Sequence, residues 1–593
     1  MKVKRLFLKI TALFFSLVML FGVAACKPKL QSGGTGTRIY ISLYSGGHGT
    51  VYFDTLIDNF MAKHPEYEGK YYIEYVPEKV HSGIVTDELT SGFGDKQMYV
   101  MAQNDVVKLA YSDLLEDLSD VALMKPDGEN GKTIGEKMVR AEKWRSIYSK
   151  YGEGLYALPY ADSTMSFVYD HDMFIENNWY TFAAPADRAA IEAQGIVCSE
   201  GTGRHAGRLV FVSADHKTNF EAGDPILTPG KDGKYGTYDD GQPITVEDWD
   251  NLIRKIGLTA KAFISAGGVG DYSQHVVSAL FAQYSGIDAW NSYFTYDSNG
   301  VALNYTDGTS APLTLETGYK CNWIDGIYKA FEFVAKYFDS RKSGDPLVSL
   351  HPAVTDGAKS HLDTQSLYLL GYQRSESNPM SAMLLDGAWW EYEARAMFNS
   401  LAETEPDRGY GKREYRMMLF PDLPGQKSEK SAISVCETGA FIVPKDSNKE
   451  RLAVTKEFLA YMLSDEGIKT FTTITGSLMP YDTEFTEEDM AKLTPFTRNM
   501  IELYYDEENI DIVRPQLASM YSPIAYASDR VNFSYFVPKI NGVAVTAPFQ
   551  AVREYSLDDI KTGLRAFYSA DEWARYIQQA KEQGFFTDGV DGE

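Results

Sequence analysis

The sequence predicts an α/β protein with a mostly parallel, helix-covered sheet, and its length of 593 residues predicts more than one lobe. Strand patterns at 38–44, 71–76 and 98–101 alternate with helical patterns, as β-α-β units require. A chain that is 44% hydrophobic and 13% aromatic can fill large cores. After the N-terminal segment, no apolar run approaches the roughly 20 residues that a membrane-spanning helix needs.

The chain begins with a pattern typical of a secretory signal. Cations between residues 2 and 9 precede an apolar run over 10–23, and the small residues before Cys26 fit a cleavage point. The end of this segment also resembles a bacterial lipobox, in which the cysteine carries the lipid. We therefore expect 1–26 to be a lipoprotein signal with Cys26 as the lipid anchor, because several acyl chains hold a protein on a membrane where one does not.

Residues 27–37 include a Gly/Ser/Thr-rich stretch and are expected to form a flexible tether. The anchored protein is expected on the outer face of the bacterial cell membrane, which it touches only through its lipid. A net charge of −25 argues against nucleic acid as a partner and against broad docking on anionic lipid.

Cysteine usage leaves the redox state open. Beyond Cys26 the chain holds Cys198, Cys321 and Cys436, and the first two either form a disulfide or remain buried thiols. No CxxC spacing is present, so the cysteines do not indicate a metal site.

The first strand–helix units place polar residues at one edge of the predicted sheet. A helical pattern starts at Tyr52 and ends at Lys63 and His64, with Pro65 beyond. Ligands collect at the carboxyl ends of parallel strands. The polar segments after the first and third strands supply the candidate ligand contacts Ser45, His48, Gln103, Asn104 and Asp105.

The middle of the chain, 181–245, is rich in Gly, Asp, Thr and Ala and is interpreted as an insertion. It holds a turn-dense acidic loop with Asp232, Asp239 and Asp240. Oxygen ligands on a Gly-punctuated loop suit calcium, although the spacing differs from that of an EF-hand. A calcium site and a solvated turn both stay open, and the sequence indicates no other cofactor.

A second strand–helix unit appears late in the chain. An apolar stretch at 439–444 is followed by a helical pattern over 449–463. Ser447 and Glu450 have the spacing of a capping box, which predicts where this helix begins.

Four blocks of sequence, in order, resemble the family-1 extracellular solute-binding proteins, the carbohydrate receptors of ABC importers. The blocks are Leu-Leu-Glu-Asp-Leu at 114–118; Gly-Leu-Tyr-Ala-Leu-Pro-Tyr at 154–160 with the polar and aromatic positions up to 174; Ala-Met-Leu-Leu-Asp-Gly-Ala-Trp at 382–389; and 438–445 through 476–480. They cover most of 38–180 and 375–485, behind the lipobox. Residues 181–370 and the tail after 485 match the family poorly.

This resemblance implies two α/β lobes that are similar in plan to maltose-binding protein and close on a ligand like a hinged clamp. By that plan, lobe 1 comprises 38–160 and 436–476, and lobe 2 comprises 163–432, with the insertion at 181–245, and 481–593. The hinge is expected near 160–163, 433–436 and 477–481.

The resemblance also implies site residues. Trp389 matches an aromatic residue that suits stacking on a sugar ring. Trp390, about 100° away on a helix, is expected either to pack in the core or to cover the rim of the site. Asp105 matches an acid that accepts hydroxyl hydrogen bonds in relatives. Ser163 stands where some relatives have glutamate, so Asp162 and Tyr160 are alternative contacts.

Enzyme classes find little support in the sequence. It holds no HExxH, GxSxG or CxxC motif. The Gly-Lys-Thr at 131–133 resembles the end of a phosphate-binding loop, but Pro126 stands where that motif needs glycine. Catalytic carboxylate pairs cannot be recognised among 82 acidic residues, so a secreted glycan-degrading hydrolase remains an alternative.

The sequence therefore predicts a non-enzymatic extracytoplasmic lipoprotein. It is expected to capture a sugar or oligosaccharide between two lobes and to deliver it, as a monomer, to the permease subunits of an ABC-type importer. A receptor for another polar solute, such as a peptide, is the alternative within the binding class.

Overall fold

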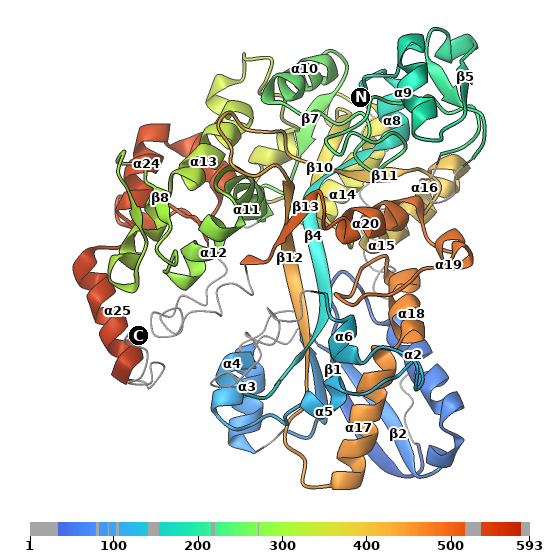
Figure 1. Cartoon of the computed structure of the whole chain (residues 1–593), viewed down its shortest axis with the longest axis vertical. Helices are drawn as coiled ribbons and strands as arrows, with labels where there is room; N and C mark the ends of the chain where they lie inside the picture. Colours follow the sequence, from blue (N-terminus) through green and yellow to red (C-terminus); the bar gives the residue numbers. More distant parts are fainter. Residues whose placement is uncertain are drawn as a thin grey trace, which may run out of the picture.

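The computed structural model describes residues 34–78, 82–92, 94–101, 106–139, 153–214, 220–270, 272–515 and 535–582. The chain forms two α/β lobes joined by long strands (Figure 1). We define each lobe by its buried apolar core. The predicted mixture of sheet and covering helices is confirmed. Within the described ranges, no helix is both long and apolar enough to cross a membrane.

Two long strands connect the lobes. They are β4 (Leu158–Asp170) and β12 (Ser431–Ile442), which pair with each other in antiparallel fashion. The main sheet has the order β2-β1-β3-β12-β4-β10-β7, with β11 added to β4 and β13 added to β12. One continuous sheet therefore passes through both lobes, and Figure 1 shows β4 and β12 running between them.

Lobe 1 is built on a parallel sheet, as the sequence predicts. The strands β1 (Thr37–Tyr44), β2 (Tyr71–Glu78) and β3 (Met98–Met101) are parallel. Their core draws apolar residues from 39–161 and from 440–481. The other elements are α2 (Val51–Lys63), η1 (Pro65–Tyr67), α3 (Ser82–Ser91), α4 (Val106–Tyr111), α5 (Ser119–Ala122), α6 (Ile134–Lys137), α17 (Lys449–Met462) and α18 (Asp465–Thr475).

Local sequence sets where the helices of lobe 1 begin and end. Helix α2 buries Tyr52, Phe53, Leu56, Ile57 and Phe60 and ends at Lys63, as its apolar spacing and Pro65 predict. The start of α17 differs from the capping-box prediction. Asn448, rather than Ser447, accepts a hydrogen bond from the backbone N–H of Arg451. Both residue types cap helices well, so backbone conformation decides between neighbouring candidates.

Lobe 2 has separate cores on the two faces of its sheet. Phe167, Met383 and Phe263 join one core, whereas their neighbours Val168, Leu384 and Ile264 join the other. This is the alternation that a buried strand requires. The strands are β7 (Lys261–Ile264), β10 (Ser381–Gly387), β11 (Tyr415–Met418) and β13 (Ile510–Val513), and the main helices are α10 (Val246–Gly257), α11 (Tyr272–Ser285), α12 (Ile287–Thr295), α13 (Asp325–Phe338), α14 (His361–Leu370), α16 (Arg395–Ala402) and α20 (Pro495–Tyr505).

Short elements complete lobe 2. They are α8 (His171–Glu176), β8 (Ala302–Asn304), β9 (Ser310–Pro312), η4 (Leu315–Trp323), η5 (Ser340–Lys342), η6 (Pro352–Thr355), η7 (Gly371–Gln373), α15 (Trp390–Glu393), η8 (Pro406–Arg408) and α19 (Glu487–Ala491). The tail adds β14 (Lys539–Ile540), β15 (Val543–Ala544), α23 (Pro548–Glu554), α24 (Leu557–Arg565) and α25 (Ala570–Glu582).

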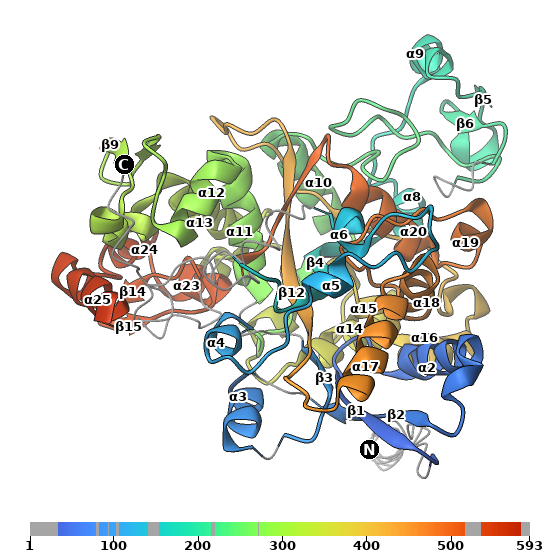
Figure 2. The same cartoon turned by 60° about the horizontal axis from the view of Figure 1, so that its bottom comes forward.

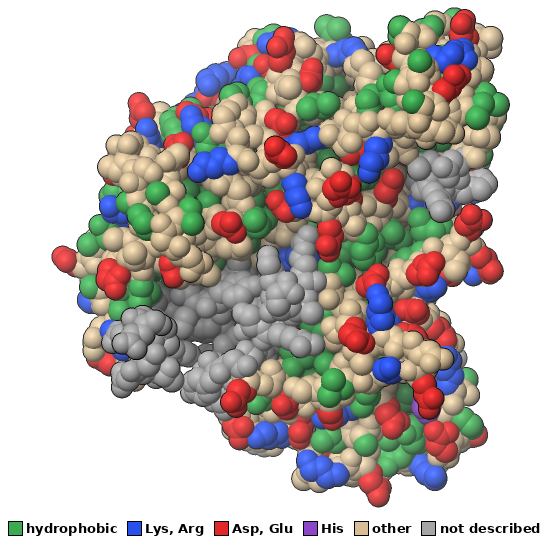
Figure 3. All heavy atoms as spheres, viewed as in Figure 1, with side chains coloured by type: hydrophobic (Ala, Val, Ile, Leu, Met, Phe, Trp, Pro, Cys, Tyr) green, Lys and Arg blue, Asp and Glu red, His purple; other side chains and the backbone are tan. Residues whose placement is uncertain are grey.

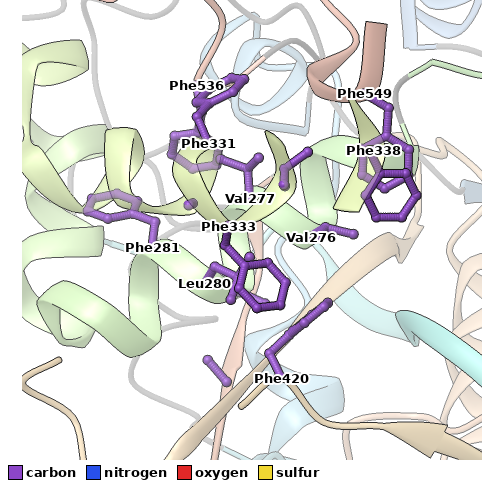
Figure 4. Packing of buried hydrophobic residues seen from close by; sticks show 14 of the residues in the cluster. Val276, Val277, Leu280, Phe281, Phe331, Phe333, Phe338, Phe420, Phe536 and Phe549 are labelled. Atoms are coloured by element: carbon purple, nitrogen blue, oxygen red, sulfur yellow. The ribbon is translucent and has the colours of Figure 1, made fainter. Parts of the chain in front are cut away.

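The tail is an integral part of the lobe 2 core. The ring of Phe549 in α23 stacks on Phe338 of α13, with centroids 3.8 Å apart. Phe536 packs against Phe281 of α11. Figure 4 shows these tail residues lying against the phenylalanines of α11 and α13. Burial of several aromatic rings fixes the tail to the lobe.

The insertion forms a small separate layer. It contains η2 (Pro185–Asp187), α9 (Arg188–Ala193), β5 (Cys198–Glu200), η3 (Gly203–His205) and β6 (Leu209–Phe211). A compact apolar cluster that includes Ile191 and Leu209 holds it together. Figure 2 shows β5, β6 and α9 standing apart from the rest of lobe 2. Cys198 lies in this cluster and Cys321 in the main core, and neither of them nor Cys436 forms a disulfide within the described part of the chain.

Candidate functional site

The carboxyl ends of strands from both lobes meet at one place, which we call the junction. Strand β12 pairs with the end of β3 at Ala440–Met101 and with β4 at Ser434–Met165. The end of β10, Gly387, pairs with Met165. Because ligands bind at the carboxyl edges of such sheets, the junction is the candidate site.

Strand β12 is irregular where it crosses the junction. Its pairing with β4 shifts between Val435 and Glu437 and again between Thr438 and Ala440. Such irregularities bend a strand and interrupt its ladder. A third chain crossing follows α18, where Leu478 joins a lobe 2 core and Met479 joins that of lobe 1. The chain therefore passes between the lobes near each of the three predicted segments.

His48, a predicted ligand contact, is fully buried at these crossings. Its Nδ1 lies 2.8 Å from Ser477 Oγ, and its Nε2 lies 3.4 Å from Ser163 Oγ. Burial lowers the pKa of His48 to about 4, and the negative charge of Glu393 partly opposes this shift. His48 thus contacts both Ser163 and Ser477 in this structure.

Asp162 also forms contacts within the protein. Arg514 Nε donates to both carboxylate oxygens, at 3.0 and 2.8 Å, and its Nη2 donates to Oδ2 as well. Tyr504 Oη donates to Oδ2 at 2.6 Å. The sequence offers Asp162 as an alternative ligand contact, and in this structure its carboxylate pairs with an arginine that follows 352 positions later. No local pattern reveals such a partner.

Tyr160 lies in the core of lobe 1 rather than on an open surface. It is 1% exposed, and its hydroxyl is 2.6 Å from that of Tyr52. Ser45 is half-buried at the end of β1, where its N–H donates to Glu78 O. The assignment of these residues to ligand binding stays a prediction.

Trp389, the predicted stacking residue, lies at the junction, where protein groups cover it. The side chain is only 5% exposed. A Cβ added to Gly47 of the first loop would overlap the Trp389 ring, so lobe 1 packs directly on it. The ring of Tyr272 meets it edge-on, with centroids 6.3 Å apart. Trp390 is fully buried on the opposite face of the sheet, as its helical offset suggests.

A polar network that the sequence did not reveal lies beside Trp389. Gln365 Nε2 donates to Asp386 Oδ2 at 3.0 Å and to Glu393 Oε2 at 2.8 Å. His361 Nε2 lies 3.5 Å from Glu393 Oε1. Burial, aided by the charge of Glu393, raises the pKa of Asp386 to about 7. His361, Glu393 and Tyr272 are partly exposed, and Tyr272 contacts both the Trp389 ring and the His361 ring.

Only one of these missed residues had a sequence signal. Glu393 follows Trp389 by one helical turn and could have been selected by that spacing. His361, Gln365 and Tyr272 come from distant segments that only the fold brings together. Gln103, Asn104, Asp105 and Cys26 lie outside the described residues.

A cavity of about 410 Å³ adjoins the junction. It is lined by the loop 265–270 after β7, by the turn 354–357, by Leu385 of β10 and by tail residues within 546–554. Gly270 and Ser273 in its wall flank Tyr272. A larger cavity of about 760 Å³ lies at the amino end of β12, near Gly286 and Lys430, and is lined by lobe 2 alone.

In the acidic loop of the insertion, aspartate carboxylates accept hydrogen bonds from backbone N–H groups of the same loop. Asp239 Oδ2 accepts from the N–H of Asp232, and Asp240 Oδ2 accepts from the N–H of Gly236. Burial and the charge of Asp239 raise the pKa of Asp232 to about 6. Among the residues that the structure describes, no group of three or more His, Cys, Asp or Glu is arranged to hold a metal ion. A calcium site stays a prediction from the sequence.

The fold and the junction define a two-lobed α/β protein, with strand ends, aromatic rings and polar groups where the lobes meet. Solved structures confirm this fold class. The bacterial solute receptor AcbH, described as having an exclusive preference for β-D-galactopyranose, superposes with a TM-score of 0.51 over 92% of this chain and 100% of its own, at 12% identity.

A probable secreted solute-binding lipoprotein from Streptomyces coelicolor gives a TM-score of 0.51 over 90% of this chain and 98% of its own, also at 12% identity. No protein-family model matches the sequence, and the search of curated proteins finds no relative. The chain therefore has the fold of bacterial solute-binding proteins, and its ligand must be inferred from its own residues.

Proposed function

We propose that the protein is an extracytoplasmic solute-binding lipoprotein that captures a sugar or oligosaccharide between its lobes. The observation that carries the proposal is the junction, where the carboxyl ends of both lobes' strands face each other across three chain crossings. Irregular pairing of β12 supports bending at this place. Opening of the lobes admits the solute, and closure buries it.

The side chains at the junction suit a sugar. Sugars present flat C–H faces to aromatic rings and hydroxyls to planar polar groups. Trp389 and Tyr272 offer rings, and Glu393, His361 and Gln365 offer donors and acceptors within one cluster. Opening of the lobes withdraws Gly47 from Trp389 and exposes the ring to the solute.

The remaining parts of the proposal come from the sequence. Cys26 is the lipid anchor that holds the protein on the outer face of the cell membrane. The closed form then docks, as a monomer, on permease subunits of an ABC-type importer. Replacement of Cys26 by serine is expected to move the protein from the membrane fraction to the medium.

The test is a thermal-shift and calorimetry screen of monosaccharides, oligosaccharides, amino acids and peptides. A sugar that binds the native state is expected to raise the melting temperature. Chromatography of the same sugar after long incubation checks that it is released unchanged. A response confined to peptides supports the receptor for other polar solutes, and steady hydrolysis supports the glycan-degrading alternative. Either result contradicts the proposal.

Trp389 provides the site-directed test. Trp389→Ala is expected to weaken sugar binding at least about tenfold, which equals about 1.4 kcal/mol. The buried Trp390→Phe serves as a control, because it changes a neighbouring ring on the other face of the sheet. Unchanged sugar affinity in Trp389→Ala contradicts the assignment of the junction as the binding site.

A further inference from the structure

The cavity of about 410 Å³ beside the junction is bounded by four chain segments that are far apart in the sequence. Its volume falls in the range of roughly 300–1,000 Å³ that is usual for small-molecule sites. The loop after β7, the turn after η6, β10 and the tail each contribute a wall. A cavity at the carboxyl ends of β7 and β10 occupies the edge where ligands of this sheet type bind.

The tail wall of this cavity is fixed rather than loosely attached. Phe549, which lines the cavity, stacks on Phe338 in the core. Arg341 Nη2 donates to the carbonyl oxygens of Val552 and Tyr555, each at 2.9 Å. The Phe549 N–H donates to Ser273 Oγ at 3.3 Å. These contacts hold α23 in one position and keep the cavity formed.

Tyr272 connects the cavity with the junction. Gly270 and Ser273, on either side of it, line the cavity. The Tyr272 ring lies 6.3 Å from that of Trp389 and 6.4 Å from that of His361. Leu385 in the cavity wall comes two residues before Gly387 on the same strand. The cavity and the junction are therefore close to each other at the start of α11 and at the end of β10, and a ligand longer than one sugar ring can extend from one toward the other.

Arg553 is a cationic hydrogen-bond donor in the cavity lining. Its Nη1 donates to Val354 O, and a guanidinium carries five N–H groups. The side chain is half-buried, and burial lowers its pKa. Within the described residues it forms no ion pair with a carboxylate. Glu554 lies at the exposed rim, where Gln550 Nε2 donates to it at 2.8 Å. Arg553 thus has donors to spare for oxygen atoms of a ligand.

We propose that this cavity is an accessory subsite that receives the distal units of an oligosaccharide bound at the junction, with Arg553 donating to their oxygens. The inference rests on the proposed function and names the preferred substrate as an oligosaccharide rather than a monosaccharide. Affinity then increases with chain length until the cavity is filled.

The experiment measures dissociation constants by calorimetry for size series of malto-, xylo- and galacto-oligosaccharides, from monosaccharide to tetrasaccharide. The expected result is that one series binds wild-type protein and that its longest members bind at least about tenfold more tightly than its shortest, a difference of about 1.4 kcal/mol. Arg553→Gln and the cavity-filling Thr546→Trp are expected to remove this gain and to leave the affinity for the shortest binding member within about twofold.

Val543→Trp is the matched control, because it places the same ring on the exposed tail strand β15, outside the cavity. It is expected to keep the length dependence of wild-type protein. Equal affinity for short and long members in wild-type protein, or a length gain that survives both cavity variants, overturns the subsite. Wild-type protein that binds no member of any series contradicts the proposed function itself.

Discussion

At the scale of single residues, buried polar groups at the junction are satisfied by partners from distant parts of the chain. Asp162, Arg514 and Tyr504 form one such group, and the Asp162 carboxylate is fully buried. Charges in this environment are stable only when paired and hydrogen-bonded. The group ties β4 to the segment that follows β13, so it fixes the geometry of a chain crossing.

Removal of one member of this group is expected to lower the stability of the folded protein. Arg514→Ala should lower the free energy of unfolding by about 3–5 kcal/mol, because it leaves a buried carboxylate without its cation. Urea denaturation followed by circular dichroism measures the change. Lys132→Ala is the control, since it removes an exposed pair with Asp482 and should have no measurable effect. Equal effects of the two substitutions contradict a structural role for the buried pair.

Glu391 gives a second prediction at the residue scale. Burial raises the pKa of Glu391 to about 7. Hydrogen bonds from the Thr494 side chain and the Gly411 backbone lower it in part. Below a pH of about 4.5 both the folded and the unfolded chain hold the proton. As the pH rises from there to about 7, the unfolded state ionises first, so this residue lowers stability progressively.

Glu391→Gln is therefore expected to remove part of the fall in stability between pH 4.5 and pH 7, at about 1.4 kcal/mol for each unit of the pKa shift. Melting curves across this range measure the effect. His48 acts in the opposite sense, because its lowered pKa makes the folded state less stable as the pH falls below about 6.5. If the stability of Glu391→Gln changes with pH in parallel with that of wild-type protein, the raised pKa of Glu391 is contradicted.

At the scale of elements, a glycine allows the first loop to approach lobe 2 closely, because Gly47 has no side chain. A Cβ at Gly47 would overlap the Trp389 ring, so Gly47→Ala is expected to push the loop away. Overpacking of this kind costs about 1–3 kcal/mol of stability. Trp389 fluorescence should also shift as the ring becomes more exposed. Gly344→Ala, where an added Cβ meets open space, is the control and should leave both unchanged.

The acidic loop of the insertion provides another test at this scale. Its carboxylates already accept backbone hydrogen bonds, so removal of calcium with EDTA is expected to leave the melting temperature unchanged. A clear fall with EDTA that added calcium reverses would instead establish the metal site at Asp232, Asp239 and Asp240, because binding to the folded state stabilises it.

At the scale of the whole molecule, one sheet is shared by the two lobes. Long-range strand pairs join the cores, while the irregular stretch of β12 lies between them. On the face shown in Figure 3, basic side chains are interspersed among acidic ones.

The sequence by itself determined the α/β class, the strands β1, β2 and β3 and the course of helix α2. These features follow from apolar periodicity, turn residues and helix-ending signals, which act over a few neighbouring residues. The signal segment and Cys26 are likewise sequence features.

Only the tertiary structure decided the rest of the site. In the structure, Asp162 pairs with Arg514, and His48 is buried between two serines. Gly47 covers Trp389, and Gln365 donates to both Asp386 and Glu393. The fold also builds a cavity wall from the tail. Each of these outcomes depends on contacts between residues that are distant in the chain, and such contacts form because buried charges and rings need partners that only folding brings within reach.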